Sequence, residues 1–350
     1  MTSSSSAPAR RRVALVGLGM AHKPHLAGLR DLSDRVEIGA CFAPSAARRA
    51  AFSAANPDLP VVGSLEQVLA DPSIDGVLIL TPPNTHLELV ERCAAAGKAV
   101  LLEKPLEISL ARARRIVETM EAAKLPLQVM LQFRFRAVSR RLREVLASGE
   151  LGEVVSASAS VRWWRTPAYY AEPGRGMKAR DGGGVLITQA IHTLDLFQSL
   201  AGPITRVAAM AVTSPLRQID TEDIAAAAIG FANGAIGTID ATTVAYPGFP
   251  ETIEIACARG TARLASQSLD IWWQDGRHER SGNDGGGGGG ADPMAFSHEP
   301  HQAVIADWLD ALDGGRAPTI SGREALRVHT LIETMLESAR SGRECAVPQE

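Results

Sequence analysis

The 350-residue chain lacks a charge excess of either sign, long apolar runs and paired cysteines. Its 36 basic and 39 acidic residues give a formal net charge of -3, and no basic tract follows residues 10–12. This balance disfavours nucleic-acid binding. No apolar run approaches the roughly 20 residues that a membrane-spanning helix needs, so a membrane partner is also disfavoured.

Cysteine is scarce, and the four present show neither a C-x-x-C pair nor a His/Cys cluster at metal-ligand spacing. Reduced thiols in a cytoplasmic protein fit this pattern, and no metal site is predicted. Residues 1–11 are rich in Ser and Arg but lack the apolar stretch of a secretory signal, so we expect a disordered tail. The acid-free composition of this tail leaves an organellar targeting segment open as the alternative.

A hydrophobic fraction of 45% over this length is enough for two cores, so two domains are expected. In the N-terminal half, short apolar strands alternate with helical segments, which indicates an α/β domain with a parallel sheet covered on both faces. Ligands of such sheets bind beyond the carboxyl ends of the strands. The expected strands are 13–16, 36–42, 76–80, 99–102 and 127–131, and the expected helices include 45–55, 86–96 and 110–123.

The first expected strand ends in a glycine turn, Gly17-Leu-Gly19, and the next helix is expected to begin between Met20 and His22. Gly17 allows a tight turn, and Gly19 lets the backbone approach a pyrophosphate that the helix N-terminus attracts. The third glycine of the dinucleotide fingerprint is missing, because His22 occupies that position. Its larger side chain predicts a helix shifted outward or an imidazole that points to solvent. After a strand, this turn predicts a doubly wound, dinucleotide-binding Rossmann domain over residues 12–127.

The end of the second expected strand bears on the choice between NAD and NADP, because an acidic residue there holds the ribose 2'-hydroxyl of NAD. Ala43 stands at the acidic position and is followed by Ser45, Arg48 and Arg49. The hydroxyl and the two guanidinium groups suit a 2'-phosphate, so the cofactor is expected to be NAD(P), with a slight preference for NADP. Solvated helix arginines are the alternative explanation.

Two further loops follow expected strands at the same edge of the sheet. In the first, prolines restrict the backbone beside the cofactor, and Asn84 is also suited to cap the next helix. The residues of this loop assigned to the cofactor are Thr81, Pro82, Pro83, Asn84 and His86. The second loop is Glu103-Lys104-Pro105, which contributes Glu103 and Lys104 to the same predicted site.

Lys104 is the predicted proton acceptor. A lysine at the end of a buried strand is partly desolvated, which lowers its pKa toward values useful for proton transfer. Hydride transfer from an alcohol needs a group to take the hydroxyl proton, and such a lysine suits that task. Glu103 alternates to the other face of the strand and is expected to anchor structure. An exposed surface lysine is the alternative for Lys104.

The C-terminal half has a different pattern, with strands of alternating polarity after a basic helix that ends near Gly149. Asn233-Gly234 between two of these strands is a strong hairpin signal. We therefore expect a second α/β domain over 128–350 with a large, open, mostly antiparallel sheet. Residues 282–290 are glycine-rich and predict a flexible surface loop. The expected strands are 154–161, 204–212, 224–231, 235–241 and 253–258.

Candidate chemistry in the second half concentrates in residues 181–195. Three glycines, 182–184, permit close backbone approach and precede an apolar helix that carries His192 and Asp195 three residues apart. Asp195 at this spacing could hold the imidazole and leave its other nitrogen for substrate. A hydrogen-bonded core histidine is the alternative for His192. One histidine with one carboxylate gives too few ligands for a metal.

Taken together, Gly17-x-Gly19, Glu103-Lys104-Pro105, Arg134-Phe135 and the glycine run with His192 and Asp195 resemble the Gfo/Idh/MocA oxidoreductases. The resemblance covers nearly the whole chain. It implies a Rossmann domain followed by a substrate-binding and oligomerisation domain, whose open sheet builds homodimers or homotetramers. It also implies an NAD(P)-dependent dehydrogenase that oxidises a secondary alcohol of a sugar, sugar acid or cyclitol.

By this resemblance Lys104 and His192 are the catalytic pair, with Lys104 taking the hydroxyl proton and His192 orienting or deprotonating the same group. Many relatives carry an acidic residue four positions before the histidine, where this chain has Thr188, so Lys104 becomes the stronger candidate base. Aromatic faces stack on sugars, and arginine binds carboxylate or phosphate. The implied substrate-binding residues are Arg134, Trp164, Arg165, Tyr170, Arg175, Thr188, His192 and Asp195.

Other activities stay open within the same resemblance. Relatives oxidise aromatic dihydrodiols or reduce imines, and the tryptophans and tyrosines before the glycine run suit a dihydrodiol. Sensor-like relatives bind dinucleotide without turnover. The presence of both Lys104 and His192 argues against such a catalytically inactive site.

Overall fold

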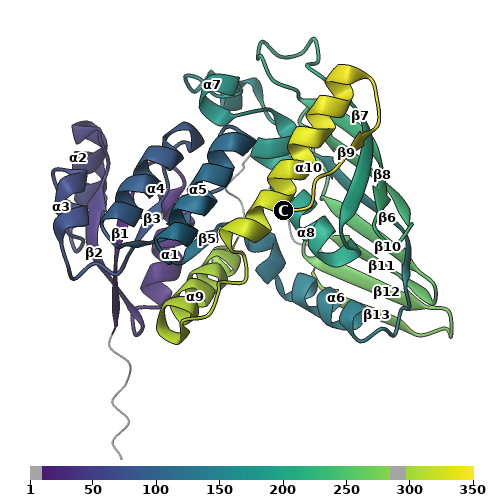
Figure 1. The fold of residues 1–350 in the computed structure, drawn as a ribbon, viewed down its shortest axis with the longest axis horizontal. Helices are drawn as coiled ribbons and strands as arrows, with labels where there is room; N and C mark the ends of the chain where they lie inside the picture. The colour runs from purple at the N-terminus through teal and green to yellow at the C-terminus, as the bar shows by residue number, and fades with distance from the viewer. Residues whose placement is uncertain (1–9, 284–296) are drawn as a thin grey trace, which may run out of the picture. The chain divides into compact units, whose positions relative to one another are not determined.

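The computed structural model describes residues 10–283 and 297–350. They divide into two compact units, each with its own sheet (Figure 1). Of the described residues, the first unit contains 10–106, 112–130 and 298–322, and the second contains 107–111, 131–283, 297 and 323–350. The predicted loop 282–290 lies outside the described residues from position 284 onward, and so does the expected tail before residue 10.

The first unit contains a five-stranded sheet in the order β2-β1-β3-β4-β5, and every neighbouring pair is parallel. β3 and β4 are apolar throughout, and Leu15 of β1, Val77 of β3 and Leu101 of β4 are fully buried. The strand order reverses between β1 and β3, which is where such sheets bind ligands. The strands are β1 (Arg11–Val16), β2 (Val36–Phe42), β3 (Gly76–Ile79), β4 (Ala99–Leu102) and β5 (Leu127–Val129).

The predicted strands of this unit are confirmed, with ends that differ by one or two residues. β1 begins at Arg11, inside the expected tail, because Arg11 pairs with Val36 of β2 and its guanidinium binds Asp75 and Asp313. The helices are α1 (His22–Asp31), α2 (Ala46–Ala55), α3 (Leu65–Ala70), α4 (His86–Ala95), α5 (Leu110–Ala122) and α9 (Glu299–Gly314).

Helix α9 belongs to the first unit, although the boundary predicted at residue 127 assigns it to the C-terminal domain. It packs on α1, where a Cβ added to Gly28 would lie 3.0 Å from the Cα of Gln302. Trp308 of α9 is fully buried, and Asp307 accepts a hydrogen bond from the Gln128 amide at 3.0 Å. Local hydrophobic periodicity does not predict these long-range contacts, which place α9 in the first unit.

The second unit contains a nine-stranded sheet in the order β13-β12-β11-β10-β6-β9-β8-β7-β14. Only β6 and β9 pair in parallel among its described strands, so the mostly antiparallel prediction is confirmed. The hairpin predicted at Asn233-Gly234 joins β8 to β9, and Gly234 has a φ of 89°. The strands are β6 (Val154–Arg162), β7 (Ile204–Val212), β8 (Ile224–Phe231), β9 (Ile236–Thr242), β10 (Thr252–Cys257), β11 (Gly260–Ala265), β12 (Ser268–Trp273), β13 (His278–Gly282) and β14 (Cys345–Ala346).

Helices pack on one face of this sheet, α8 against β6 and β10 and α6 against β11, β12 and β13 (Figure 1). Strand burial alternates accordingly, and apolar side chains such as Met210 and Ile236 are exposed. The helices and helical turns are η2 (Gln132–Phe135), α6 (Ala137–Ala147), η3 (Pro167–Ala171), α7 (Lys178–Asp181), η4 (Leu186–Ala190), α8 (Ile191–Ala201) and α10 (Gly322–Ser341).

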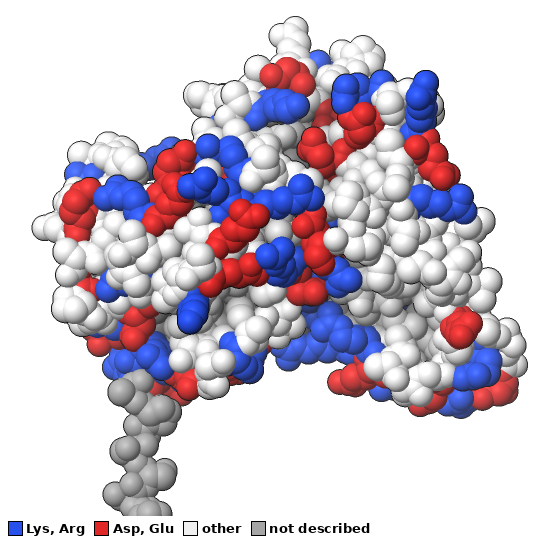
Figure 2. Space-filling view, in the orientation of Figure 1, with Lys and Arg blue, Asp and Glu red and all other residues white. Residues whose placement is uncertain are grey.

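The surface charges and the free cysteines agree with the sequence expectations of balanced charge and reduced thiols. Basic and acidic side chains are interspersed on the face shown in Figure 2, with ion pairs such as Arg112–Glu88 at 2.8 Å. All four cysteines are free thiols, and burial raises the pKa of Cys41 and of Cys93 to about 12. Within the described part of the chain, no helix combines the length and the apolar character needed to cross a membrane.

Candidate functional site

The glycine turn after β1 lies at the carboxyl edge of the first sheet. Gly17 has a φ of 110°, and a Cβ added there would lie 2.6 Å from the carbonyl carbon of Leu80, so a larger residue would collide. A Cβ on Gly19 would lie 3.7 Å from Nη1 of Arg48. The N-cap residue of α1, Ala21, provides no side-chain cap. A bound anion would therefore meet helix N–H groups that no side chain caps.

The imidazole of His22 does not point to solvent, as the sequence had suggested it could. It is half-buried and packs edge-on against the Phe52 ring at 5.1 Å, and its Nδ1 lies 2.5 Å from the Gly19 carbonyl oxygen. Burial lowers the pKa of His22, which favours the neutral ring. The histidine therefore fills space between the glycine turn and α2.

The end of β2 places one arginine toward the glycine turn. Ser45 caps α2 by accepting a hydrogen bond from the Arg48 amide at 3.3 Å, and Ala43 is buried. Arg49 donates to the carbonyl oxygens of Ala43 and Pro44 at 2.7 and 3.0 Å. Of the two arginines, Arg48 is the one whose guanidinium is near Gly19, as described above.

The loop after β3 differs from the prediction at Asn84. This residue lies within the 3-10 turn η1 (Pro83–Thr85), and the N-cap of α4 is Thr85. The expectation that Asn84 caps the helix is wrong, because α4 begins at His86 as predicted and Thr85 directly precedes it. The hydroxyl of Thr85 donates to that of Thr81 at 2.7 Å, so the loop is closed by its own side chains.

His86 is fully buried at the start of α4. Its Nδ1 lies 3.1 Å from the carbonyl oxygens of both Pro105 and Leu106, and its Nε2 lies 2.9 Å from that of Thr81. Both ring nitrogens therefore contact backbone. His86 therefore joins the β3 loop to the segment after β4 and supports both structurally.

Lys104 follows β4 at the same edge. The Glu103 amide donates to the Ile79 carbonyl oxygen of β3 at 2.9 Å, which extends the pairing of the two strands. Glu103 also accepts a hydrogen bond from the Lys104 amide at 2.9 Å and contacts His25 at 2.7 Å. Burial opposes ionisation, but the hydrogen bond from His25 lowers the pKa of the Glu103 carboxyl to about 2. Glu103 thus anchors the backbone of Lys104, which is half-buried and joined to a cis Pro105.

In the second unit, Asp195 pairs with Arg134. The two form a bidentate ion pair, with Nε to Oδ2 at 2.7 Å and Nη2 to Oδ1 at 2.5 Å, and both side chains are buried. Arg134 also binds Glu324 at 3.0 Å. Although burial opposes the charge, Asp195 raises the pKa of Arg134. The expectation that Asp195 holds His192 is wrong, because the carboxylate is taken by a guanidinium on a distant segment.

His192 lies at the start of α8 and is 8% exposed. Its ring stacks on Phe133 of η2, with centroids 4.9 Å apart and an angle of 25°. The guanidinium of Arg136 lies over the same phenyl ring, 3.3 Å from its centroid. The imidazole is therefore oriented by an aromatic neighbour, and not by the carboxylate that the sequence suggested.

The glycine run allows close approach of the protein's own backbone. A Cβ on Gly184 would lie 1.7 Å from the carbonyl oxygen of Glu222, whose carboxylate accepts from the Gly184 and Leu186 amides. The π-helical turn η4 follows, a local geometry that is frequent at functional sites. Thr188 in η4 donates its hydroxyl to the Gly184 carbonyl oxygen at 2.6 Å, so it braces the turn.

Arginines and aromatic rings from residues 163–175 form a group that Arg217 joins from beyond the glycine run. Arg165 is 2% exposed, donates to the Gln189 side chain at 3.0 Å and lies 5.0 Å from the Trp163 ring centre. Arg175 lies 4.4 Å above Tyr169 and pairs with Glu172. In the same group, Arg217 lies over Trp164, and the Tyr170 hydroxyl is 3.0 Å from that of Thr243. Cation–π contacts of this kind hold guanidinium groups in fixed directions.

Known proteins match both units. Residues 11–131 match the family described as "Oxidoreductase family, NAD-binding Rossmann fold", and residues 139–263 match "GFO/IDH/MocA C-terminal domain". D-apiose dehydrogenase of Paraburkholderia graminis is 30% identical over 346 residues, covering 95% of this chain and 89% of that protein. The chain belongs to the Gfo/Idh/MocA family of oxidoreductases.

Other similar proteins align over nearly the whole chain. Inositol 2-dehydrogenase of Rhizobium meliloti is 25% identical, covering 96% of this chain and 99% of that protein. The solved WlbA dehydrogenase from Bordetella pertussis, in complex with NADH and UDP-GlcNAcA, is 27% identical. It superposes with a TM-score of 0.83, covering 97% of this chain and all of that one. This chain is accordingly an NAD-binding oxidoreductase with the two-domain fold of the family.

The residues around the glycine turn fit the dinucleotide that the Gfo/Idh/MocA family implies. Gly17 and Gly19 provide a turn without side chains, and α1 begins there without a side-chain cap. Ala43 places no carboxylate at the end of β2. These residues would hold a pyrophosphate and a ribose in the manner of a Rossmann fold.

Two residues of the arginine and aromatic group were missed by sequence reasoning. Gln189 lies three positions before His192, so helical spacing could have identified it as a neighbour on the same face. Arg217 lies about 50 residues from Trp164, and no local pattern signals its contact with that ring. Only the folded chain brings it into the group.

Proposed function

We propose that this chain is an NAD(P)-dependent dehydrogenase that oxidises a secondary alcohol of a sugar, sugar acid or cyclitol. The observation that carries this is the position of Lys104 two residues after the end of β4, at the same sheet edge as the Gly17–Gly19 turn. The relatives named D-apiose dehydrogenase and inositol 2-dehydrogenase support the substrate class. The bound nicotinamide would accept the hydride from the alcohol carbon.

Lys104 is the proposed base and takes the hydroxyl proton on Nζ. Its backbone is anchored by Glu103, which accepts from its amide at 2.9 Å, so the start of the side chain is fixed. His192, held against Phe133, is proposed to hydrogen-bond to the same hydroxyl. Thr188 supplies no carboxylate, and its hydroxyl already donates to Gly184. Proton transfer to a positioned side chain contributes about 10²- to 10⁴-fold in rate.

Substrate recognition is assigned to the arginine and aromatic group, with Trp164, Arg165, Tyr170 and Arg175 as the contacting residues. Guanidinium groups fixed over aromatic rings suit a ligand with hydroxyls and a carboxylate or phosphate. Arg134 and Asp195 are proposed to support this site by fixing η2 and α8, because their bidentate pair joins the two segments.

For the cofactor, we propose a slight preference for NADP. Arg48 is near Gly19, and the turn after β2 lacks the carboxylate that binds the 2'-hydroxyl of NAD. The remaining proposed cofactor contacts are Gly17, Met20, Ala43, Ser45, Thr81, Pro82, Pro83 and Asn84. Measured dissociation constants for the two dinucleotides test the preference directly.

The chain is also proposed to form a homodimer or homotetramer through the second sheet. Met210 and Val212 of β7 are 76% and 53% exposed, and Ile236 of β9 is 61% exposed. Exposed apolar side chains on a sheet favour association with another surface. Light scattering after size-exclusion chromatography would contradict the proposal if it gave the mass of one chain at micromolar concentration.

The test of the function is a screen of nicotinamide reduction with sugars, sugar acids, cyclitols and aromatic dihydrodiols. Turnover with a member of the first three classes is expected. Turnover with dihydrodiols alone would replace the substrate class. Dinucleotide binding without turnover on any alcohol would make the chain a sensor and contradict the proposal.

A further inference from the structure

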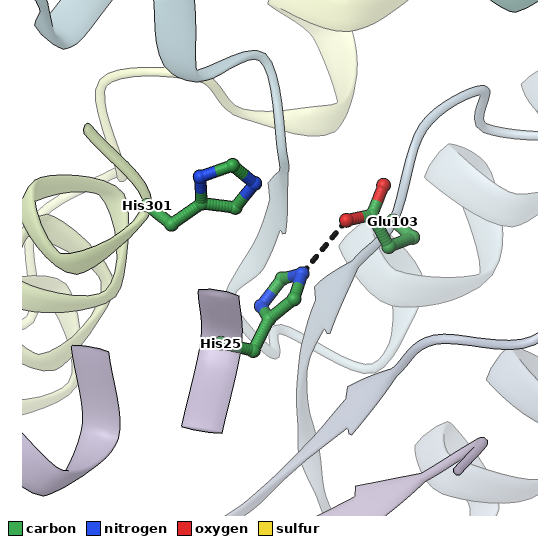
Figure 3. Close-up of side chains that lie close together, drawn as sticks. All are labelled: His25, Glu103 and His301. Carbon is green, nitrogen blue, oxygen red and sulfur yellow. Dashed lines mark hydrogen bonds and ion pairs between the residues drawn. The ribbon is translucent and has the colours of Figure 1, made fainter. Parts of the chain in front are cut away.

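Three potential metal ligands meet in the first unit, outside the residues that the proposed reaction uses as acid or base. His25 lies on α1, Glu103 follows β4 and His301 lies on α9 (Figure 3). One ligand atom from each lies within 4.8 Å of the other two. Figure 3 shows the imidazoles of His25 and His301 pointing toward the Glu103 carboxylate. His25 Nε2 is hydrogen-bonded to Glu103 Oε1 at 2.7 Å.

The cluster is buried and its charge state suits a cation. His25 is 0% and His301 is 3% exposed, and the Glu103 side chain is 14% exposed. Burial lowers the pKa of His301 to about 3, so this imidazole is neutral near pH 7. Glu103 is ionised, as described above. A neutral imidazole and a carboxylate are the protonation states that bind a metal.

We propose that His25, Glu103 and His301 form a binding site for a divalent transition metal ion of the zinc class. Two imidazoles and one carboxylate are a donor set of zinc and related ions. Bonds of about 2.0–2.2 Å in a tetrahedron put ligand atoms about 3.4 Å apart, so the side chains need to move by about 1 Å. The fourth position is left for water.

The site has a structural consequence. It links α1, the end of β4 and α9, and α9 is nearly 200 residues distant in sequence from Glu103. Glu103 would bind the metal through Oε1, while its Oε2 keeps the hydrogen bond from the Lys104 amide. A metal that binds the folded state stabilises it by mass action.

The test measures metal binding and not turnover, so it is independent of the proposed dehydrogenase activity. The full chain is dialysed against a chelator and titrated with Zn²⁺, and bound zinc is quantified after removal of free ion. We expect about one equivalent per chain and a higher midpoint of thermal unfolding with Zn²⁺.

The variants are His301→Ala and His301→Gln, the second of which keeps a side chain of intermediate size in the space. The matched control is His298→Ala, which removes an exposed histidine of the same region that pairs with Asp31. Loss of a ligand is expected to weaken affinity by at least about 10- to 100-fold, and the control is expected to bind as the parent does. Equal binding by both His301 variants and the parent, or no binding by the parent, would overturn the proposal.

A spectroscopic measurement on the unmodified chain does not depend on the folding of any variant. Co²⁺ in a site of nitrogen and oxygen ligands gives visible absorption without the intense thiolate bands of cysteine ligation. Thiolate bands at one equivalent would assign the ion to cysteine and overturn the site. Their absence, with tetrahedral cobalt absorption, would support it.

Discussion

Replacing Asp195 by Asn should destabilise the second unit far more than breaking a surface ion pair. The Asp195 carboxylate is 1% exposed and holds the Arg134 guanidinium through two hydrogen bonds. Asn keeps the volume of the side chain but removes the charge. Arg134 then remains buried with only one of its two carboxylate partners, Glu324. The perturbation is therefore electrostatic, with little change in packing.

The expected loss is about 3 kcal/mol, a factor of about 100 in the unfolding equilibrium. Breaking a buried ion pair by removing one partner costs about 3–5 kcal/mol. The lower end applies, because Arg134 keeps Glu324 at 3.0 Å, and that carboxylate is 36% exposed. The control is Asp240→Asn, which breaks an exposed pair with Arg162 and is expected to cost about 0.2–1 kcal/mol.

Urea unfolding followed by tryptophan fluorescence is the assay. Four of the five tryptophans, all except Trp308, lie in the second unit, so the signal reports mainly on that unit. Replacing both partners, Arg134→Met with Asp195→Leu, should recover most of the loss. A cost for Asp195→Asn no greater than that of the Asp240 control would refute the reasoning. Unchanged stability with a shifted pH profile of turnover would also refute it, because this result would indicate that Asp195 interacts with His192.

Three further outcomes are expected. Lys104→Met should lower kcat by about 10²- to 10⁴-fold with nearly unchanged dinucleotide affinity. The control Lys124→Met, at an exposed lysine, should leave kcat and affinity unchanged. Full activity of Lys104→Met would contradict the role of Lys104 as base. Arg48→Ala should raise the dissociation constant of NADP by about 10- to 100-fold and that of NAD little. Arg49→Ala is the comparison variant. An equal loss of affinity for both dinucleotides in Arg48→Ala would contradict a 2'-phosphate contact. Disulfide exchange reagents should modify Cys345 first in the native protein and the three buried thiols only on unfolding, since burial suppresses the thiolate. Rapid native labelling of the three buried thiols, in Cys345→Ser and parent protein alike, would show that the buried sites open.

The sequence predicted the first sheet well because its strands are short, mostly apolar runs between helices. A strand of a parallel sheet that is buried on both faces has consecutive apolar residues, so such strands can be recognised from neighbouring residues alone. The Asn233-Gly234 hairpin was equally local, since two residues determine the turn. The glycine turn and the lysine loop could be placed at one edge of the sheet for the same reason.

Side-chain partners were less predictable. Asp195 was assigned to His192 from a spacing of three residues, yet a guanidinium 61 residues away offers two hydrogen bonds and the opposite charge. Asn84 was expected to cap a helix that begins after a short 3-10 turn. In both cases a local pattern competed with a geometry that the pattern does not encode.

The sequence by itself determined the strands of the first sheet, the glycine turn and the residues at the carboxyl edge of that sheet. Tertiary structure decided that α9 packs on α1, that Arg134 binds Asp195 and that His25, Glu103 and His301 meet. The reason is physical: periodicity records whether a residue is buried, whereas the partner of a buried charge is chosen by distance and direction among segments far apart in the chain.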